Sequence, residues 1–262
     1  MAPVTSVILL YGLVALFGAL IGSFLNVCIY RLPRRESLVW PGSHCPSCEV
    51  AIAPYDNVPV VSYLLLGGRC RACREPIAMR YPLVEALNAL AYAVIIWRFG
   101  WTWTSVGAMT LFSALLVSAG TDLTHRIIPD RVTLPGMAVG LVGAATVLPL
   151  PLIDAVLGIV VGGGLLWLIA WASLYVFGKE GMGGGDIKLL AMVGAFLGWK
   201  PALLTVMIGA TIGSLLSIGL MAAHIIKRDQ YIPFGPFLAI GAVISMLAAS
   251  DILHWYAALV LR

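Results

Sequence analysis

Residues 6–29 read SVILLYGLVALFGALIGSFLNVCI, and no Lys or Arg precedes Arg31. A helix needs about 20 apolar residues to cross the roughly 30 Å of hydrocarbon in a bilayer. This run is long enough, and it is longer than the apolar core of a secretory signal peptide. We therefore expect residues 1–30 to form a first transmembrane helix that the protein retains.

The rest of the 262-residue chain repeats this apolar character. Hydrophobic residues make up 61% of the sequence and charged residues 11%, and the mean hydropathy is +0.99. A water-soluble domain could not bury so much apolar surface in one core, so lipid is the expected surroundings. The sequence predicts an all-α polytopic membrane protein with about eight transmembrane helices, over residues 6–29, 83–98, 104–121, 132–149, 153–177, 187–199, 202–223 and 234–260.

Basic residues border these runs, and their distribution predicts an orientation. Cytoplasmic loops of membrane proteins carry an excess of Lys and Arg. With the N-terminus outside, all 16 basic residues except Arg98, Lys200 and Arg262 fall on the inside. The inside set is Arg31, Arg34, Arg35, Arg69, Arg71, Arg74, Arg80, Arg126, Arg131, Lys179, Lys188, Lys227 and Arg228. Basic residues at the borders of apolar runs indicate membrane topology. They do not form a continuous basic stripe, so no nucleic-acid partner is expected.

Residues 31–80 form the sizeable soluble segment of the chain. They are rich in Pro, Gly, Arg and Cys, and so short a segment needs a staple to fold. Two Cys-x-x-Cys pairs, Cys45 with Cys48 and Cys70 with Cys73, are separated by the 21 residues 49–69. This spacing is typical of a zinc site. We predict a small cytoplasmic zinc-binding loop domain over 31–80 and a second membrane domain over 81–262.

Four thiolates close the coordination shell of zinc, so this metal is expected to be structural rather than catalytic. Disulfides are less favoured because the predicted topology places the loop in the reducing cytoplasm. The fifth cysteine, Cys28, lies in the first apolar run. It is expected to be a small buried apolar residue.

Two acids at the edges of apolar runs are candidates for chemistry. Asp122 directly follows LFSALLVSAGT, and Asp186 closes the segment Gly181–Asp186, which has four glycines within five positions. Acids at the membrane border indicate function by default. Two adjacent carboxylates can share a proton, as in aspartic proteases. Glycines beside them permit close approach of an extended substrate backbone.

Sequence spacing leaves alternatives open for these residues. Asp122 can instead end a helix and pair with Arg126, and Asp186 can cap the N-terminus of the following helix. Asp130 is a rival to Asp122, since it follows Pro129 and can cap the next helix. Lys188 either stabilises charge near the site or extends towards the membrane interface.

Several segments, in this order, resemble the bacterial type IV prepilin peptidases. They run from Gly22 to about Gly241 and are GSFLNVCIYRLP, the two Cys-x-x-Cys pairs, YDNVPVVSYLLLGGRC, RYPLVE, TDLTHRIIPD, EGMGGGDIKLL and IPFGPFLA. The GxGD pattern alone is shared with presenilin-like and signal-peptide-peptidase proteins. The ordered set is far more specific.

The resemblance implies an intramembrane aspartyl protease of the bacterial inner membrane, with its active site facing the cytoplasm. It implies cleavage of the basic leader from type IV prepilins or type II secretion pseudopilins. The catalytic aspartates of the family match Asp122, rather than Asp130, and Asp186. The resemblance also implies that residues 81–262 are the peptidase domain.

The resemblance also implies a methyltransferase activity, in which S-adenosylmethionine donates a methyl group to the newly exposed N-terminal amine. By position, weak candidates for binding this cofactor are Glu49, Asn57, Tyr81 and Glu85. Polar loop contacts, or a helix start at Pro82, account equally well for these four. The sequence predicts no particular oligomeric state.

Two other classes of function are compatible with the residues alone. In a membrane transporter or channel, the acids would bind a cation and the glycine-rich segment would be a broken helix. In a zinc-stapled membrane scaffold, neither acid would carry chemistry. An assay of prepilin cleavage distinguishes a peptidase from both of these classes.

Overall fold

The computed structural model describes residues 4–178, 182–227 and 232–260. Lys179, Gly181, Arg228 and Arg262, which entered the predictions above, lie outside these ranges. The long helices are α1 (Val4–Arg31), α3 (Arg80–Phe99), α4 (Trp103–His125), α5 (Asp130–Thr146), α6 (Leu152–Phe177), α7 (Gly184–Leu197), α8 (Trp199–Ala222) and α9 (Gly235–Val260). The segment between α1 and α3 contains a short 3-10 helix, η1 (Pro54–Asn57), and the short helix α2 (Val61–Leu65).

The all-α class is confirmed, because each predicted apolar run corresponds to one long helix and the described residues contain no β-strand. At two places the predicted run extends past the helix by more than one residue. The run over 132–149 stops being helical after Thr146, since Pro149 disfavours helix in the residue before it. The run over 187–199 ends at Leu197, because Gly198 adopts φ +84° and α8 begins at Trp199.

Six of these helices are long and apolar enough to cross a membrane: α1, α3, α4, α6, α8 and α9. The remaining two, α5 with 17 residues and α7 with 14, are shorter. Their sides still pack within the bundle, where α7 buries a continuous stretch from Leu189 to Phe196. A short helix enclosed by longer ones can hold a polar residue at depth without exposing it to lipid.

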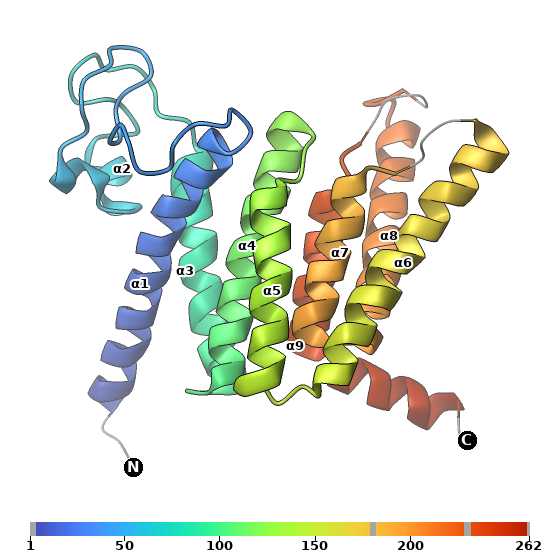
Figure 1. Ribbon diagram of the computed structural model, residues 1–262. Coiled ribbons are helices and arrows are strands. Elements are labelled where there is room, and N and C mark those ends of the chain that lie inside the picture. Colours follow the sequence, from blue (N-terminus) through green and yellow to red (C-terminus); the bar gives the residue numbers. More distant parts are fainter. Residues whose placement is uncertain (1–3, 179–181, 228–231, 261–262) are drawn as a thin grey trace. The chain divides into compact units, whose positions relative to one another are not determined.

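The chain divides into two compact units, Met1–Trp101 and Thr102–Arg262. In the first unit α1 packs along α3 (Figure 1). Gly18 and Gly22 permit this approach, because a Cβ at Gly22 would lie 2.7 Å from the Cα of Glu85. Asn88 donates a buried hydrogen bond of 2.7 Å to the carbonyl of Gly18. Small residues and interhelical hydrogen bonds are the usual devices of helix packing in lipid.

In the second unit, α4 to α9 run alternately in opposite directions (Figure 1). The tightest contact joins α6 and α7, where Gly158 and Gly194 pack backbone against backbone. The C-terminal ends of α4 and α6 therefore lie at the same end of this unit as the N-terminal ends of α5, α7 and α9. Residues far apart in the sequence can meet at that end.

The α6–α7 contact leads to a prediction about stability. Changing Gly158 to Ala places a methyl group against the carbonyl of Gly194. Overpacking of this kind costs about 1–3 kcal/mol, and the neighbour here is rigid backbone. We expect a lower unfolding temperature in detergent, followed by circular dichroism. Gly164→Ala is the matched control, because Gly164 lies in the same helix and a Cβ there would meet no neighbouring helix within 4 Å. Equal stability of both variants would contradict the packing described.

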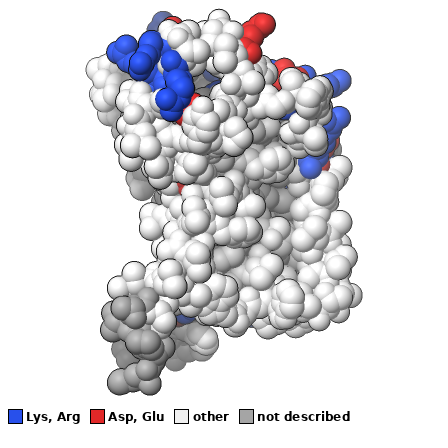
Figure 2. Space-filling model, turned by 90° about the vertical axis from the view of Figure 1, so that its left-hand side faces the viewer, with Lys and Arg blue, Asp and Glu red and all other residues white. Residues whose placement is uncertain are grey.

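Charged side chains are unevenly distributed over the surface. On the face shown in Figure 2, Lys, Arg, Asp and Glu gather towards one end, and a broad uncharged surface lies below them. On α1, large apolar side chains such as Leu13, Phe17 and Leu20 are exposed. An exposed apolar surface of this breadth is suited to lipid.

Candidate functional site

Asp122 lies in the last turn of α4 and is only 4% exposed. Its Oδ2 atom accepts a buried hydrogen bond of 2.9 Å from the backbone N–H of Gly235. Gly235 is the first residue of α9, where the backbone N–H groups have no partner within the helix. A side chain at Gly235 would displace the carboxylate, since its Cβ would lie 2.6 Å from Oδ2.

Asp186 is the third residue of α7 and is 5% exposed. Its N–H closes a turn with the carbonyl of Gly183, at 3.1 Å. Gly183, not Asp186, occupies the N-cap position, so the N-cap alternative is wrong. Within the described residues the buried Oδ1 atom of Asp186 has no hydrogen-bond partner. A buried carboxylate oxygen without a partner is costly and is typical of a site that receives a ligand or water.

The structure brings Asp122 and Asp186 together. Ile128 packs against Gly185, the neighbour of Asp186, and against Gly235, whose N–H donates to Asp122. A Cβ at Gly185 would lie 2.9 Å from the Cβ of Ile128, and one at Gly235 would lie 3.2 Å from its Cδ1. The connection between α4 and α5 thus forms one wall of a site with two carboxylates.

Asp130 is the first residue of α5, and Pro129 occupies the N-cap position, so the cap alternative for Asp130 is wrong. Both of its carboxylate oxygens accept hydrogen bonds from Lys188, at 2.7 and 2.8 Å. This pair is solvent-exposed, with side-chain exposures of 40% for Lys188 and 53% for Asp130. Lys188 therefore binds Asp130, a partner that neither alternative from the sequence included. Exposed ion pairs contribute little to stability.

The four cysteines of the loop form a cluster in the first unit. The sulfur atoms of Cys45, Cys48, Cys70 and Cys73 all lie within 4.8 Å of one another, and those of Cys45 and Cys73 are 3.8 Å apart. Tetrahedral zinc with Zn–S bonds of about 2.3 Å places its sulfurs roughly 3.8 Å apart. The cluster therefore fits a metal of this size.

Both Cys-x-x-Cys pairs have the same backbone geometry. Cys45 N–H donates to Val50 O and Glu49 N–H donates to Cys45 O, and the second pair repeats this pattern from Cys70 to Glu75. The residue after each second cysteine, Glu49 or Arg74, has a positive φ of 58° or 61°. Backbone N–H groups of Ser47 and Cys48 lower the pKa of the Cys45 thiol to about 6. The lower pKa favours the thiolate of Cys45, the form that binds metal, whereas burial and the neighbouring thiols raise the pKa of Cys73.

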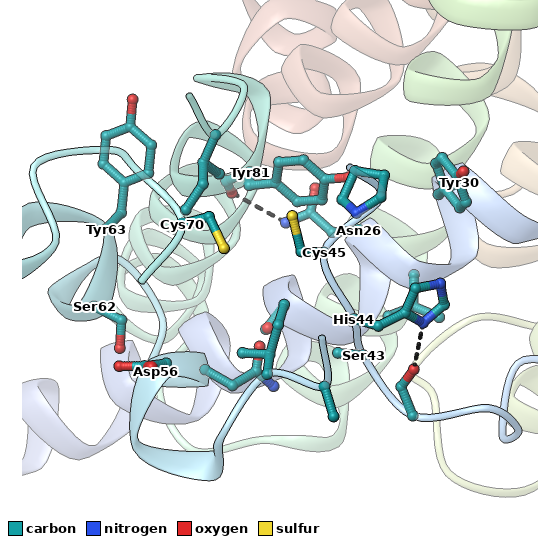
Figure 3. A pocket seen from close by; sticks show the side chains of 18 of the residues that line it. Asn26, Tyr30, Ser43, His44, Cys45, Asp56, Ser62, Tyr63, Cys70 and Tyr81 are labelled. Carbon is teal, nitrogen blue, oxygen red and sulfur yellow. Dashed lines mark hydrogen bonds between the residues drawn. The ribbon is translucent and has the colours of Figure 1, made fainter. Parts of the chain in front are cut away.

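Next to the cluster lies a cavity of about 1250 Å³, lined by α1, the loop and the start of α3. Figure 3 shows Cys45 and Cys70 on its wall with their sulfur atoms facing each other, and Tyr81 with Asn26 beside them. The Asn26 amide donates to the Tyr81 carbonyl at 3.0 Å. Buried Arg31 donates to the carbonyls of Ser37 and Pro41, at 2.9 and 2.7 Å. The Asn26 bond joins α1 to α3 and the Arg31 bonds attach the loop to α1, so hydrogen bonds hold the elements around the cavity together.

Three of the four residues predicted for cofactor binding line this cavity, and the fourth does not. Asn57, Tyr81 and Glu85 line it. Glu49 is exposed on the first Cys-x-x-Cys turn and is not among the lining residues. Glu85 is buried, and its Oε2 accepts a hydrogen bond of 2.7 Å from the N–H of Val60.

Sequence reasoning missed several contacts that shape these sites. Gly235 donates to Asp122, although the only signal in the sequence is a glycine before Pro236 at the start of an apolar run. Arg71 binds both oxygens of Asp56, at 2.7 and 2.6 Å, which ties the second cysteine pair to η1. This guanidinium also holds the pKa of the Asp56 carboxyl below its usual range.

Fold and site together define a class: helical membrane proteins with two buried aspartates at helix ends and a separate four-cysteine cluster. Comparison with known proteins agrees with this. The model of the bacterial peptidase A24 N-terminal domain matches residues 16–99, and that of the type IV leader peptidase family matches residues 109–218. The chain belongs to the type IV leader peptidase family.

Curated relatives match nearly the whole chain. A protein of Pseudomonas aeruginosa named prepilin leader peptidase/N-methyltransferase is 39% identical, over 92% of this chain and 91% of its own. Relatives of the same name from Aeromonas hydrophila and Neisseria gonorrhoeae are 38% and 34% identical, the first over 95% of this chain and 94% of its own, the second over 93% of each. No solved structure was found to match the chain.

Proposed function

We propose that this protein is a bacterial inner-membrane enzyme that removes the basic leader from type IV prepilins or type II secretion pseudopilins and then methylates the new N-terminal amine. The names of the curated relatives support both activities. A helix of the substrate and the lipid around it would contact the apolar surface of the bundle. The observation that carries the proposal is the burial of two carboxylates, Asp122 and Asp186, at one end of the second unit.

For cleavage, we assign the catalytic roles to Asp122 and Asp186. A water molecule between them loses a proton to one carboxylate and attacks the peptide carbonyl, while the other carboxyl group protonates the carbonyl oxygen. The N–H of Gly235 orients Asp122. The glycines before Asp186 leave room for an extended substrate backbone.

We place this site at the cytoplasmic face. The support is the distribution of basic residues, because those bordering the site, Arg126, Arg131 and Lys188, belong to the set predicted inside. The basic leader of the substrate would then stay in the cytoplasm, and its apolar stem would remain in the membrane.

For methylation, we propose S-adenosylmethionine as methyl donor and the cavity of the first unit as its binding site. Small-molecule sites usually enclose about 300–1000 Å³, so a cavity of about 1250 Å³ can hold a donor together with a chain end. Asn57, Tyr81 and Glu85 line this cavity and remain candidates for binding either the donor or the chain end, whereas the position of Glu49 in the cysteine turn favours a structural role.

We assign a structural zinc ion to Cys45, Cys48, Cys70 and Cys73. The spacing of their sulfur atoms fits four thiolates around one ion, and four thiolates leave no open position for substrate. The proposed division is thus a first helix at 1–30, a zinc-binding loop at 31–80 and a peptidase domain at 81–262. Since α3 packs along α1 in the first unit, we expect an isolated 81–262 fragment to expose the α3 surface that α1 covers.

One experiment tests both activities. The protein purified in detergent is incubated with a prepilin and methyl-labelled S-adenosylmethionine, and the product mass is measured. We expect loss of the leader and gain of one methyl group. Without the donor, cleavage should proceed and methylation should not. An intact substrate, with cation flux in proteoliposomes, would instead support a transporter.

A further inference from the structure

We propose that Glu85 is a catalytic residue of the methyl transfer: its carboxylate binds the new N-terminal amine of the cleaved substrate and accepts a proton from it. This inference rests on the proposed methyltransferase activity and on the cavity of the first unit. It assigns the amine, rather than the methyl donor, to this side chain.

Glu85 differs from the other acids that line the cavity. Glu36 and Glu75 are exposed, and Asp56 is held by both hydrogen bonds from Arg71. Glu85 alone among these four is buried, at 8% exposure. A buried carboxylate that faces a cavity is expensive unless a cation or hydrogen-bond donor meets it there.

The contacts of Glu85 hold its carboxylate in place but leave some of its hydrogen-bond acceptor positions unoccupied. Val60 N–H donates to Oε2 at 2.7 Å, and Ser23 of α1 lies beside the carboxylate in the cavity wall. A carboxylate has about four lone-pair positions, so positions remain for the N–H groups of an amine. Both residues come from elements that pack around the cavity, α1 and the loop.

Val60 gives a second indication that this geometry is specific. Its φ is +61°, a conformation that is strained for a β-branched residue. The hydrogen bond to Glu85 is one of the contacts that keep this backbone in place. Backbone strain of this kind is found most often at active sites and ligand-binding sites.

The chemistry of the transfer requires a proton acceptor. An α-amino group has a pKa of about 7.7–8.0 and is mostly protonated near neutral pH, so it lacks a free lone pair. When the ammonium gives a proton to Glu85, the nitrogen lone pair attacks the methyl carbon of the sulfonium. The N–C bond forms, the C–S bond breaks, and sulfur keeps the electron pair as a neutral thioether. Aromatic side chains of the lining, Tyr55 and Tyr81, suit the cationic donor.

The test is Glu85→Gln, because glutamine keeps an oxygen for Val60 N–H and its amide can donate to Ser23. We expect binding of labelled S-adenosylmethionine and leader cleavage to remain at wild-type level, and methylation to fall by about 10²-fold or more. Glu85→Asp keeps a carboxylate and should retain a measurable part of the rate. Glu49→Gln, at an exposed acid outside the cavity lining, should methylate like wild type.

Three outcomes would overturn the inference. Wild-type methylation by Glu85→Gln would exclude a proton acceptor at this position. Loss of donor binding in Glu85→Gln would assign the residue to the donor instead, and equal loss of methylation in the Asp and Gln variants would indicate a purely structural role. A wild-type protein that cleaves but never methylates would refute the proposed function itself.

Discussion

Replacing Asp122 or Asp186 with Asn is expected to reduce leader cleavage by at least about 10²–10⁴-fold, the range by which acid–base catalysis accelerates reactions. Asparagine has nearly the same shape as aspartate, so the amide oxygen in the Asp122→Asn variant could still accept the hydrogen bond from Gly235. The amide can neither take a proton from water nor give one to the carbonyl oxygen. The measurement is the rate of leader removal from a prepilin, with thermal unfolding in detergent as a check of the fold.

Asp130→Asn is the matched control for this prediction. Asp130 lies eight residues after Asp122, at the rival position in the sequence, but it is exposed and bound to Lys188. Loss of an exposed ion pair costs little, so we expect cleavage close to wild type. Cleavage that survives in both Asp122→Asn and Asp186→Asn would refute the dyad and favour a scaffold without chemistry.

Replacing Cys70 with Ser is expected to remove the metal from the loop and with it the methyltransferase activity. A structural zinc site supplies folding free energy directly, because the ligands are not prearranged in the unfolded chain. Cys70 also belongs to the wall of the cavity. Metal content per chain should fall, proteolysis within residues 31–80 should become faster, and labelled S-adenosylmethionine should no longer bind.

Cys28→Ala provides the control for the cysteine variant. Cys28 is buried in α1 and is not a member of the cluster. We expect its replacement to leave metal content and donor binding unchanged. A Cys70→Ser protein that keeps its metal and resists protease like the wild type would contradict the assignment of the metal to these cysteines.

The cysteine cluster and the helices were predictable because each depends on residues close together in the chain. A Cys-x-x-Cys turn bends locally, and its backbone hydrogen bonds join Cys45 to Val50 and Cys70 to Glu75. Because both turns lie in one short loop, their cysteines are close together in the folded chain. Apolar runs form helices in lipid because every backbone polar group must be satisfied within the segment.

The ends of these helices were less predictable. Gly198 separates α7 from α8 only because the chain needs a positive φ there, and hydropathy does not distinguish this glycine from those inside helices. The same holds for Gly158, which looks like any helical glycine until Gly194 is placed against it.

The sequence by itself determined that the chain is a helical membrane protein, which cysteines gather, and that Asp122 and Asp186 lie at helix ends. These are local properties, set by hydropathy and by short spacings. Only the tertiary structure decided that Asp122 meets Asp186 and Gly235 while Asp130 binds Lys188, and that Glu85 is a buried acid facing a cavity. Such pairings join helices that are distant in the chain, and they depend on how closely glycine-lined helix faces pack.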